Sequence, residues 1–139
     1  MYDIKFIEEQ NQNEIVPFLE KLDASIPVEV LKERLENMFQ NAYKCIGVYH
    51  GPKLIGISGL WVLTKYYIGK HIEPDNVYII SEYQGKGIGK QLMEWIFNYG
   101  KSIGCNGSEL NCYTKNESGQ RFWESQGYVM VGYHYQKRF

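Results

Sequence analysis

Three glycines within five residues mark the part of this sequence with the clearest chemical meaning. They are Gly85, Gly87 and Gly89, in the run Y-Q-G-K-G-I-G-K from Tyr83 to Lys90. A short apolar stretch precedes the run and a helical pattern follows it. The first turn of a helix presents about four backbone N–H groups without internal partners, and the helix dipole adds positive charge there. Glycine lets a phosphate come close to those groups, so the run predicts a pyrophosphate-binding site.

Two better-known phosphate motifs do not fit this run. A P-loop starting at Gly85 requires a second glycine where Lys90 stands. The dinucleotide fingerprint G-x-G-x-x-G requires its third glycine at the same place. Lys86 and Lys90 add local positive charge. A plain tight turn without a ligand stays open as the alternative interpretation.

The composition indicates a single globular domain. A chain of 139 residues is large enough for one core of its own, and 44% hydrophobic with 15% aromatic residues argues against disorder. The formal charge is -1, from 15 basic and 16 acidic residues. No overall field therefore attracts nucleic acid or a membrane surface, and we expect neither as a partner.

Cysteine usage and the start of the chain indicate a cytoplasmic protein. Cys45, Cys105 and Cys112 form no C-x-x-C pair, and we interpret them as isolated thiols in a reducing compartment. Met1 leads into mixed polar sequence without a signal-peptide pattern. No apolar run approaches the ~20 residues that span a bilayer. No metal site is expected.

Apolar periodicity outlines the elements that position the glycine run. The predicted elements of the first half are a strand at 2–7, a helix capped by Asn13, a helix at 27–40, and strands at 43–49 and 54–65 joined by a turn at 50–53. The second half predicts a buried strand at 77–80, a helix from Ile88 to a cap at Gly104, a strand at 108–114, a helix at 116–126 closed by Gly127, and an alternating terminal strand at 128–139. Residues 66–74 fit no clear pattern. The order β-α-α-β-β-β-α-β-α-β is that of one α/β domain.

The glycine run and its flanks resemble the GCN5-related N-acetyltransferase (GNAT) family. Gln84, Gly87 and Gly89 form Q-x-x-G-x-G, which is similar to the family's acyl-CoA loop. The longer stretch V-Y-I-I-S-E-Y-Q-G-K-G-I-G-K-Q-L-M resembles its fourth strand, loop and long helix, and N-E-S-G-Q-R-F-W-E-S-Q-G-Y resembles its second signature. The resemblance implies one GNAT domain over residues 1–139. Its expected fold is α/β, with a mixed six- to seven-stranded central sheet flanked by about four helices.

The resemblance also implies an activity and a set of ligand-binding residues. The activity is direct transfer of an acetyl group from acetyl-CoA to a primary amine within a ternary complex. The acceptor is a small molecule, or a lysine or N-terminal amine of a peptide. Main-chain groups of the fourth strand would hold the pantetheine arm together with Asn116, and the loop would hold the pyrophosphate. A simple helix cap stays open as the role of Asn116, and the two roles do not exclude each other. The implied residues are Tyr78, Ile79, Ile80, Gln84, Gly85, Lys86, Gly87, Ile88, Gly89, Lys90, Asn116 and Trp123.

Acetylation of an amine requires a group that accepts its proton. A lysine-like amine has a pKa of about 10.4, so near pH 7 only about one molecule in 2,000 is neutral. Making it neutral costs about 4–5 kcal/mol, which a general base or a desolvating pocket must offset. Some family members carry a Glu nine residues before the loop's Arg or Gln, and that position is Asp75 here. Glu73 and His71 are the nearby competitors, and a solvated turn is the alternative for Asp75.

Trp123 departs from the family pattern. The family usually has a Phe-Tyr pair whose tyrosine hydroxyl protonates the CoA sulfur, whereas this chain has Phe122-Trp123. An indole N–H donates a hydrogen bond but supplies no proton near neutral pH. Four alternatives stay open: Trp123 solvates the sulfur, another group protonates it, CoA leaves as the thiolate, or Trp123 is purely a core residue.

The acceptor and the catalytic competence are the least determined features. Tyr66, Tyr67, His71, Tyr133 and Tyr135 are candidates to line an acceptor groove, although alternating tyrosines on a terminal strand also suit packing or a homodimer contact. The rival function is a CoA-binding sensor or interaction module with little or no turnover. A donor other than acetyl-CoA is a third alternative.

Overall fold

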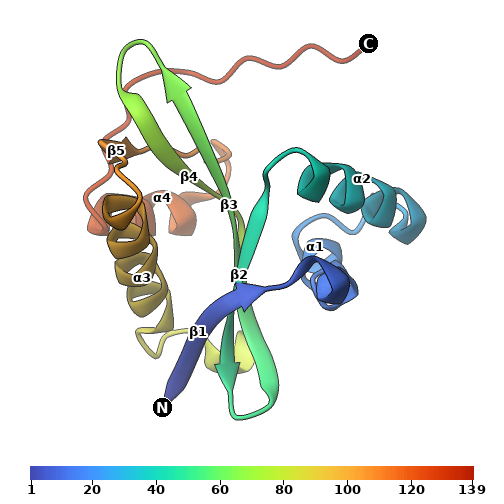
Figure 1. The fold of residues 1–139 in the computed structure, drawn as a ribbon. Coiled ribbons are helices and arrows are strands. Elements are labelled where there is room, and N and C mark those ends of the chain that lie inside the picture. The colour runs from blue at the N-terminus through green and yellow to red at the C-terminus, as the bar shows by residue number, and fades with distance from the viewer.

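The computed structural model describes residues 1–139 and places a five-stranded sheet between two groups of helices (Figure 1). The strands are β1 (Tyr2–Ile7), β2 (Lys44–His50), β3 (Lys53–Lys65), β4 (Gly69–Ile79) and β5 (Gly107–Ser108). The α-helices are α1 (Val16–Leu22), α2 (Val28–Gln40), α3 (Ile88–Ser102) and α4 (Glu117–Ser125), with short 3-10 helices at Glu9–Glu14 and Ser81–Tyr83. Strands β1 to β4 pair antiparallel in chain order, and β5 joins β4 in parallel.

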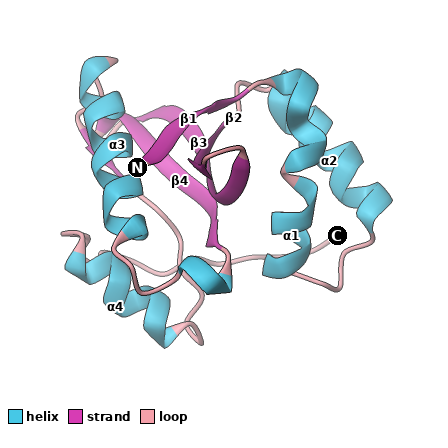
Figure 2. Cartoon of the chain, turned by 90° about the horizontal axis from the view of Figure 1, so that it is seen from below, coloured by secondary structure: helices cyan, strands magenta, loops and turns pink.

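Each face of the sheet has its own apolar core. α3 and α4 lie on one side of the sheet and α1 and α2 on the other (Figures 1 and 2). On the α3 side, Ile88, Leu92 and Ile96 are spaced four residues apart and pack on the sheet. On the α1–α2 side, Phe18 and Leu35 belong to the second core.

Most helix boundaries agree with the sequence prediction. α2 begins directly after Pro27, and Asn116 caps α4 by accepting a hydrogen bond from the Gly119 N–H. Gly104 and Gly127 adopt the left-handed conformation after α3 and α4. The predicted cap at Asn13 is wrong, because that residue lies inside a 3-10 helix and α1 begins after Ile15.

β4 is longer than the predicted strand at 77–80. It starts at Gly69 and takes in Pro74-Asp75-Asn76, which resemble a turn in sequence. Asp75 and Tyr78 of β4 are three residues apart, but their partners on β3, Gly59 and Ile57, are only two residues apart. The extra residue makes a bulge in β4. Asn76 accommodates the extra residue with a φ of 42°.

The prediction of the last two strands of the sheet is wrong. Of the strand expected at 108–114, only Gly107–Ser108 pairs with β4. Residues 129–139, called here the tail, form no strand and are exposed throughout. An alternating pattern becomes a strand only beside a neighbour that supplies ladder hydrogen bonds, and the tail has no neighbour here. The sheet therefore has five strands instead of six or seven. None of the helices combines the length and the apolar character that crossing a membrane requires.

Candidate active site

The loop between β4 and α3 has the conformation that its glycines predict. Gly85 and Gly87 have φ values of 75° and 78°, in the left-handed region that side chains with a Cβ avoid. Gly87 is also the residue that caps α3. A Cβ built on either glycine would meet nothing within 4 Å, so the space beside the loop is open.

Backbone N–H groups without partners are concentrated in this loop. None of the N–H groups from Gly85 to Lys90 donates a hydrogen bond within the chain, and the first to do so is that of Gln91, to the Gly87 carbonyl at 3.2 Å. The loop is exposed to solvent from Gln84 to Gly87. Such a row of amides at the N-terminus of a fifteen-residue helix is suited to bind an anion.

Gly89 is required for a different reason. A Cβ at this position would lie 3.0 Å from two ring carbons of Phe122 on α4. The absence of a side chain therefore lets α4 pack against the first turn of α3. This contact brings the second of the two sequence signatures beside the first.

Gln84 fastens the loop to the end of β4. Its side-chain Nε2 donates to the Ile79 carbonyl over 2.7 Å. The glutamine of Q-x-x-G-x-G thus acts on the conformation of the loop.

Positive charge around the loop comes from two parts of the chain. The Lys86 ammonium lies 5.4 Å from the centre of the Tyr83 ring, and the Lys53 ammonium lies 5.7 Å from it. His50 Nδ1 is 2.7 Å from the Tyr83 hydroxyl. Lys53 and His50 come from the β2–β3 turn, and no local sequence signal associates that turn with the glycine loop. Lys90 is exposed on the first turn of α3.

The outer edge of β4 has no strand partner beyond Ile72. β4 and β5 pair only at His71–Ile72 with Gly107–Ser108. The Ile80 N–H donates to Ile55 of β3, and alternate residues of a strand direct their backbone groups to opposite sides. Val77 and Ile79 therefore direct theirs to the open side, whereas Tyr78 and Ile80 direct theirs to β3. The sequence analysis selected residues 78–80 by position along the chain and took no account of the bulge.

A network of contacts across the sheet holds the β4 bulge. The buried Tyr43 hydroxyl donates to Asn76 Oδ1 over 2.9 Å, and burial raises the pKa of Tyr43. Gly59 of β3 lies beneath, where a Cβ would overlap both Asn76 and Tyr43. Asp75 accepts at both oxygens, from the Trp61 indole N–H at 2.9 Å and from the Asn76 N–H at 2.8 Å.

The other two titratable candidates form a pair. His71 is fully buried, and its Nε2 lies 3.1 Å from Glu73 Oε2. Its Nδ1 lies 3.2 Å from the Gly69 carbonyl oxygen, which fixes the ring from the other side. Glu73 is opposite Trp61 in the ladder, and Trp61 packs on the core of the α1–α2 side, so Glu73 faces that side. Glu73 keeps one carboxylate oxygen without a protein partner.

Residues of α4 and the aromatic candidates complete the site. Asn116 Oδ1 caps α4, which leaves its Nδ2 without a protein acceptor. Trp123 packs between Phe122 and Tyr128, with ring centres 5.0 Å and 5.8 Å away.

The tyrosines proposed for an acceptor groove divide into two groups. Tyr66 and Tyr67 are exposed in the β3–β4 turn, where the Tyr67 hydroxyl donates to Glu109 Oε2 over 2.9 Å. Tyr133 and Tyr135 are on the exposed tail and line no groove in the single chain. No group of three His, Cys, Asp or Glu side chains is arranged to hold a metal ion.

Comparison with known proteins assigns the family. The sequence model of the acetyltransferase (GNAT) family matches residues 8–128. This chain therefore belongs to the GNAT acetyltransferase family. No curated protein sequence matches it.

Several solved structures share the fold. They include ribosomal-protein-alanine N-acetyltransferase from Brucella melitensis biovar Abortus 2308, with a TM-score of 0.82, 22% identity, and 100% of both chains covered. Glucosamine-6-phosphate N-acetyltransferase from Arabidopsis thaliana has a TM-score of 0.74 and 21% identity, covering 100% of this chain and 99% of that chain. The aminoglycoside N-acetyltransferase AAC(6')-Iy, solved with CoA, has a TM-score of 0.86 and 14% identity. The match covers 100% of this chain and 95% of that chain. At these identities the likeness establishes the fold alone.

Proposed function

We propose that this protein transfers the acetyl group of acetyl-CoA directly to a primary amine, with both substrates bound at once. The observation that carries the proposal is the row of unpaired N–H groups from Gly85 to Lys90 beside the open edge of β4. The row suits the pyrophosphate of CoA, and the backbone groups of Val77 and Ile79 suit the pantetheine arm. Lys86 and the exposed Lys90 supply positive charge for the phosphates, and Lys53 lies nearby, paired with Glu82 over 3.6 Å.

Acetyl-CoA would supply an acetyl thioester, whose carbonyl requires a hydrogen-bond donor as charge develops on its oxygen. Backbone N–H groups on the open side of β4 are suitable donors. The bulge held by Tyr43 and Asn76 sets the direction of these groups. Asn116 Nδ2 is a further free donor close to the start of α4.

For the proton acceptor we favour Glu73 over Asp75. Both Asp75 oxygens already accept N–H groups, which stabilises the anion and fixes it beside Trp61. Glu73 has a free oxygen, is only 18% exposed, and is oriented by the buried His71. On this assignment Asp75 is a positioning residue for the bulge.

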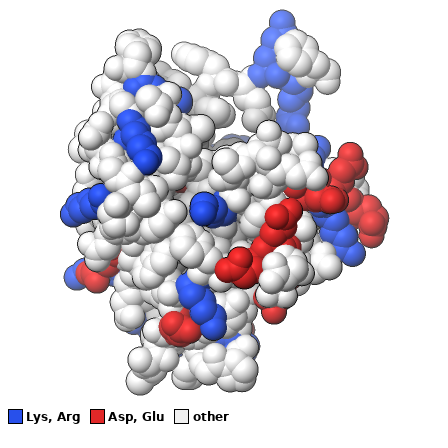
Figure 3. Space-filling view, viewed as in Figure 1, with Lys and Arg blue, Asp and Glu red and all other residues white.

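The acceptor is expected to be a cation before it loses its proton. Glu109 lies one residue past the β4–β5 pairs, beside Glu73, and its buried Oε1 has no hydrogen-bond partner. A protonated amine would satisfy such an oxygen. Acidic side chains also gather over the side of the molecule where α1 and α2 lie (Figure 3), including the exposed Glu29, Glu33 and Glu36 of α2.

A CoA-binding module without turnover is the second candidate, because Trp123 replaces the usual tyrosine and supplies no proton. Titration calorimetry with CoA, followed by thiol release from acetyl-CoA over a panel of amines, separates the two. We expect binding and turnover. Binding without turnover on any amine would favour the module, and no binding by the folded protein would exclude both. Parallel assays with propionyl- and succinyl-CoA define the donor.

The assignment of the base is tested by Glu73→Gln and Asp75→Asn. General-base catalysis contributes about 10²–10⁴ in rate, so Glu73→Gln should lower kcat by about 100-fold or more with a small change in KM for acetyl-CoA. Asp75→Asn should act mainly through KM, because it disturbs the bulge. A large loss of kcat in Asp75→Asn, with mainly a KM effect in Glu73→Gln, would instead identify Asp75 as the base.

A further inference from the structure

His71 is a titratable side chain that lies completely inside the protein, next to the proposed base. It is fully buried on β4, two residues before Glu73. A histidine ring in the interior must direct each of its nitrogens at a suitable partner, because an unsatisfied polar group there is costly. The partners of the two nitrogens therefore indicate which of them carry protons.

Both ring nitrogens of His71 face oxygen atoms that accept hydrogen bonds. Nδ1 lies 3.2 Å from the carbonyl oxygen of Gly69, which has no proton to donate. Nε2 lies 3.1 Å from Glu73 Oε2, and an ionised carboxylate also only accepts. A neutral imidazole has a single N–H, so one of its nitrogens would face an oxygen with no proton between them. Both contacts become hydrogen bonds when the pair holds one more proton.

No lysine or arginine neutralises the carboxylate of Glu73. The ion pairs of the chain are Lys5–Asp3, Lys32–Glu29, Lys53–Glu82 and His71–Glu73. The Glu73 side chain is only 18% exposed, and a carboxylate so far removed from water needs a countercharge. Imidazole is ordinarily a stronger base than a carboxylate, so the additional proton resides on the ring.

We propose that His71 is an imidazolium ion in the folded protein and that it is a positioning residue for Glu73. Its two N–H groups donate to Gly69 and to Glu73, which fixes the ring and the direction of the carboxylate. The positive charge lies in the interior behind Glu73, where the low dielectric strengthens the attraction between them. Glu73 is thereby kept ionised, with Oε1 free for the acceptor. The catalytic meaning of this arrangement rests on the proposed function.

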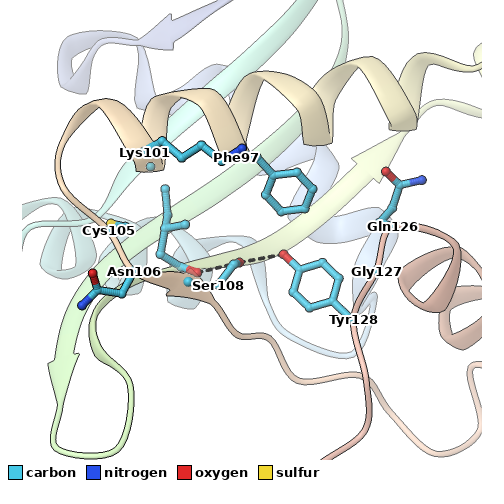
Figure 4. Close-up of a pocket in the computed structure, with 11 residues that line it drawn as sticks. Phe97, Lys101, Cys105, Asn106, Ser108, Gln126, Gly127 and Tyr128 are labelled. Carbon is cyan, nitrogen blue, oxygen red and sulfur yellow. Dashed lines mark hydrogen bonds between the residues drawn. The ribbon is translucent and has the colours of Figure 1, made fainter.

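A second carboxylate lies on the same face of the sheet. Ser108 faces α3, where its Oγ lies 2.6 Å from the Tyr128 hydroxyl beside a cavity of about 280 Å³ (Figure 4). Successive side chains of a strand point to opposite faces, so Glu109 points to the face that carries Glu73. Glu109 Oε2 accepts from the Tyr67 hydroxyl, and its buried Oε1 has no partner.

The other charged groups of this region are engaged elsewhere. Asp75, next along the same face of β4, accepts from Trp61 and from the Asn76 N–H. Lys65 is exposed and lies close to the Tyr67 hydroxyl in the β3–β4 turn. Neither group makes a hydrogen bond or an ion pair with His71. The charge of the imidazolium is therefore set mainly against Glu73 and Glu109.

This charge distribution suits the proton transfer of the proposed reaction. The ammonium group of the acceptor gives its proton to Glu73 Oε1, and the amine nitrogen keeps the electron pair with which it attacks the thioester carbonyl. His71 keeps both of its ring protons. Together, His71, Glu73 and Glu109 carry one negative charge before this transfer and none after it. No net positive charge is thus left in the interior, and Glu73 afterwards gives the proton to water.

Nitrogen NMR of the histidine rings tests the protonation of His71 without any substrate. In the ¹⁵N-labelled full chain at about pH 7.5, His71 should carry protons on both ring nitrogens, whereas the exposed His134 should carry one. Loss of its signals in His71→Gln assigns them. In Glu73→Gln the new amide donates to Nε2, so the ring should keep a proton on Nδ1 alone.

Asp75→Asn is the matched control for the NMR experiment, because it removes a carboxylate from the same face without touching His71. It should leave both ring nitrogens protonated. Circular dichroism checks that the variants are folded. A single protonated ring nitrogen in the unsubstituted protein, or two in folded Glu73→Gln, would overturn the proposal.

The pH dependence of turnover tests the positioning role. His71→Gln keeps a hydrogen-bond donor for Glu73 but removes the positive charge, so the carboxylate holds a proton more readily. The rise of kcat with pH should therefore move to higher pH by about one unit or more, with little change in the KM for acetyl-CoA. An unshifted profile in folded His71→Gln would refute the positioning role. Absence of turnover in the unsubstituted protein would instead count against the proposed function, while the NMR result would still decide the protonation of His71.

Discussion

At the level of single residues, glycine serves two purposes in the loop before α3. Gly85 and Gly87 supply a left-handed backbone beside open space, whereas Gly89 leaves room for Phe122. The loop thus combines a conformational requirement with a packing requirement. The proposed function adds a third requirement, access for a phosphate, which falls on Gly87 because it precedes the free amides of α3.

The substitutions Gly87→Ala and Gly104→Ala distinguish the conformational requirement from the requirement for phosphate access. Both glycines have positive φ, 78° and 85°, and neither has an atom within 4 Å of a built Cβ. Each alanine should therefore lower the free energy of unfolding by about 1–2 kcal/mol. Only Gly87→Ala should also raise the KM for acetyl-CoA, by about tenfold, because its methyl group would enter the proposed anion-binding site. Urea unfolding and initial rates measure the two effects, and an equal rise in KM for both variants would count against the loop.

At the level of elements, the bulge of β4 depends on residues from other strands. Tyr43 precedes β2 and Gly59 belongs to β3, yet together they determine where Asn76 sits. The bulge in turn decides which residues of β4 direct their backbone groups to the open side. The geometry of the proposed thioester site is therefore set from across the sheet.

Tyr43→Phe should destabilise the protein by about 1–2 kcal/mol, because Asn76 loses its hydrogen-bond partner in a half-buried site. Tyr78→Phe is the control on the same side of the sheet, since its hydroxyl makes no hydrogen bond, and it should cost less than about 0.5 kcal/mol. Denaturant midpoints measure both. A similar loss in the two variants would mean that the hydroxyl of Tyr43 is unimportant.

Elements whose signals are local could be predicted from the sequence, and elements that depend on distant contacts could not. Apolar spacing and caps predict the helices α2, α3 and α4, and the Gly-Pro turn predicts the hairpin of β2 and β3. Pro74-Asp75-Asn76 looks like a turn because its neighbours Gly59 and Tyr43 are remote in sequence. The tail alternates like a strand, but only a neighbour makes it one.

The same division holds for the candidate site. The conformation of the glycine loop could be predicted because its glycines and the helix after it are contiguous in the sequence. Sheet pairing brings Lys53 close to Tyr83 and lets Trp61 donate a hydrogen bond to Asp75. No spacing along the chain indicates either contact.

At the level of the whole molecule, buried tyrosine and cysteine side chains should make the free energy of unfolding fall at alkaline pH. Burial raises the pKa of Tyr128 from 10.0 to about 12 and that of Cys45 from 9.0 to about 12. The folded state holds these protons more tightly than the unfolded chain does. Their contribution is complete below the ordinary pKa values and is lost as pH rises toward 12, by up to about 1.4 kcal/mol per pH unit for each group.

We therefore expect the free energy of unfolding to fall steadily from about pH 9 to about pH 12, with less loss in Tyr128→Phe. That variant should reduce the decline by about 2 kcal/mol over the range where tyrosine in the unfolded chain ionises. Urea midpoints at several pH values measure it, with Tyr66→Phe at an exposed position as the control. A decline of the same size in Tyr128→Phe would show that other groups govern alkaline unfolding.

The ring of Tyr83 joins parts of the chain that are otherwise far apart. Tyr2 and His50 pack edge-on against it, while the ammonium groups of Lys53 and Lys86 approach it. The start of the chain and the β2–β3 turn are thereby connected to the loop that we propose binds the pyrophosphate. Lys53 of that turn also pairs with Glu82 over 3.6 Å. Lengthening or stiffening the turn should therefore shift Tyr83 and the glycine loop that follows it.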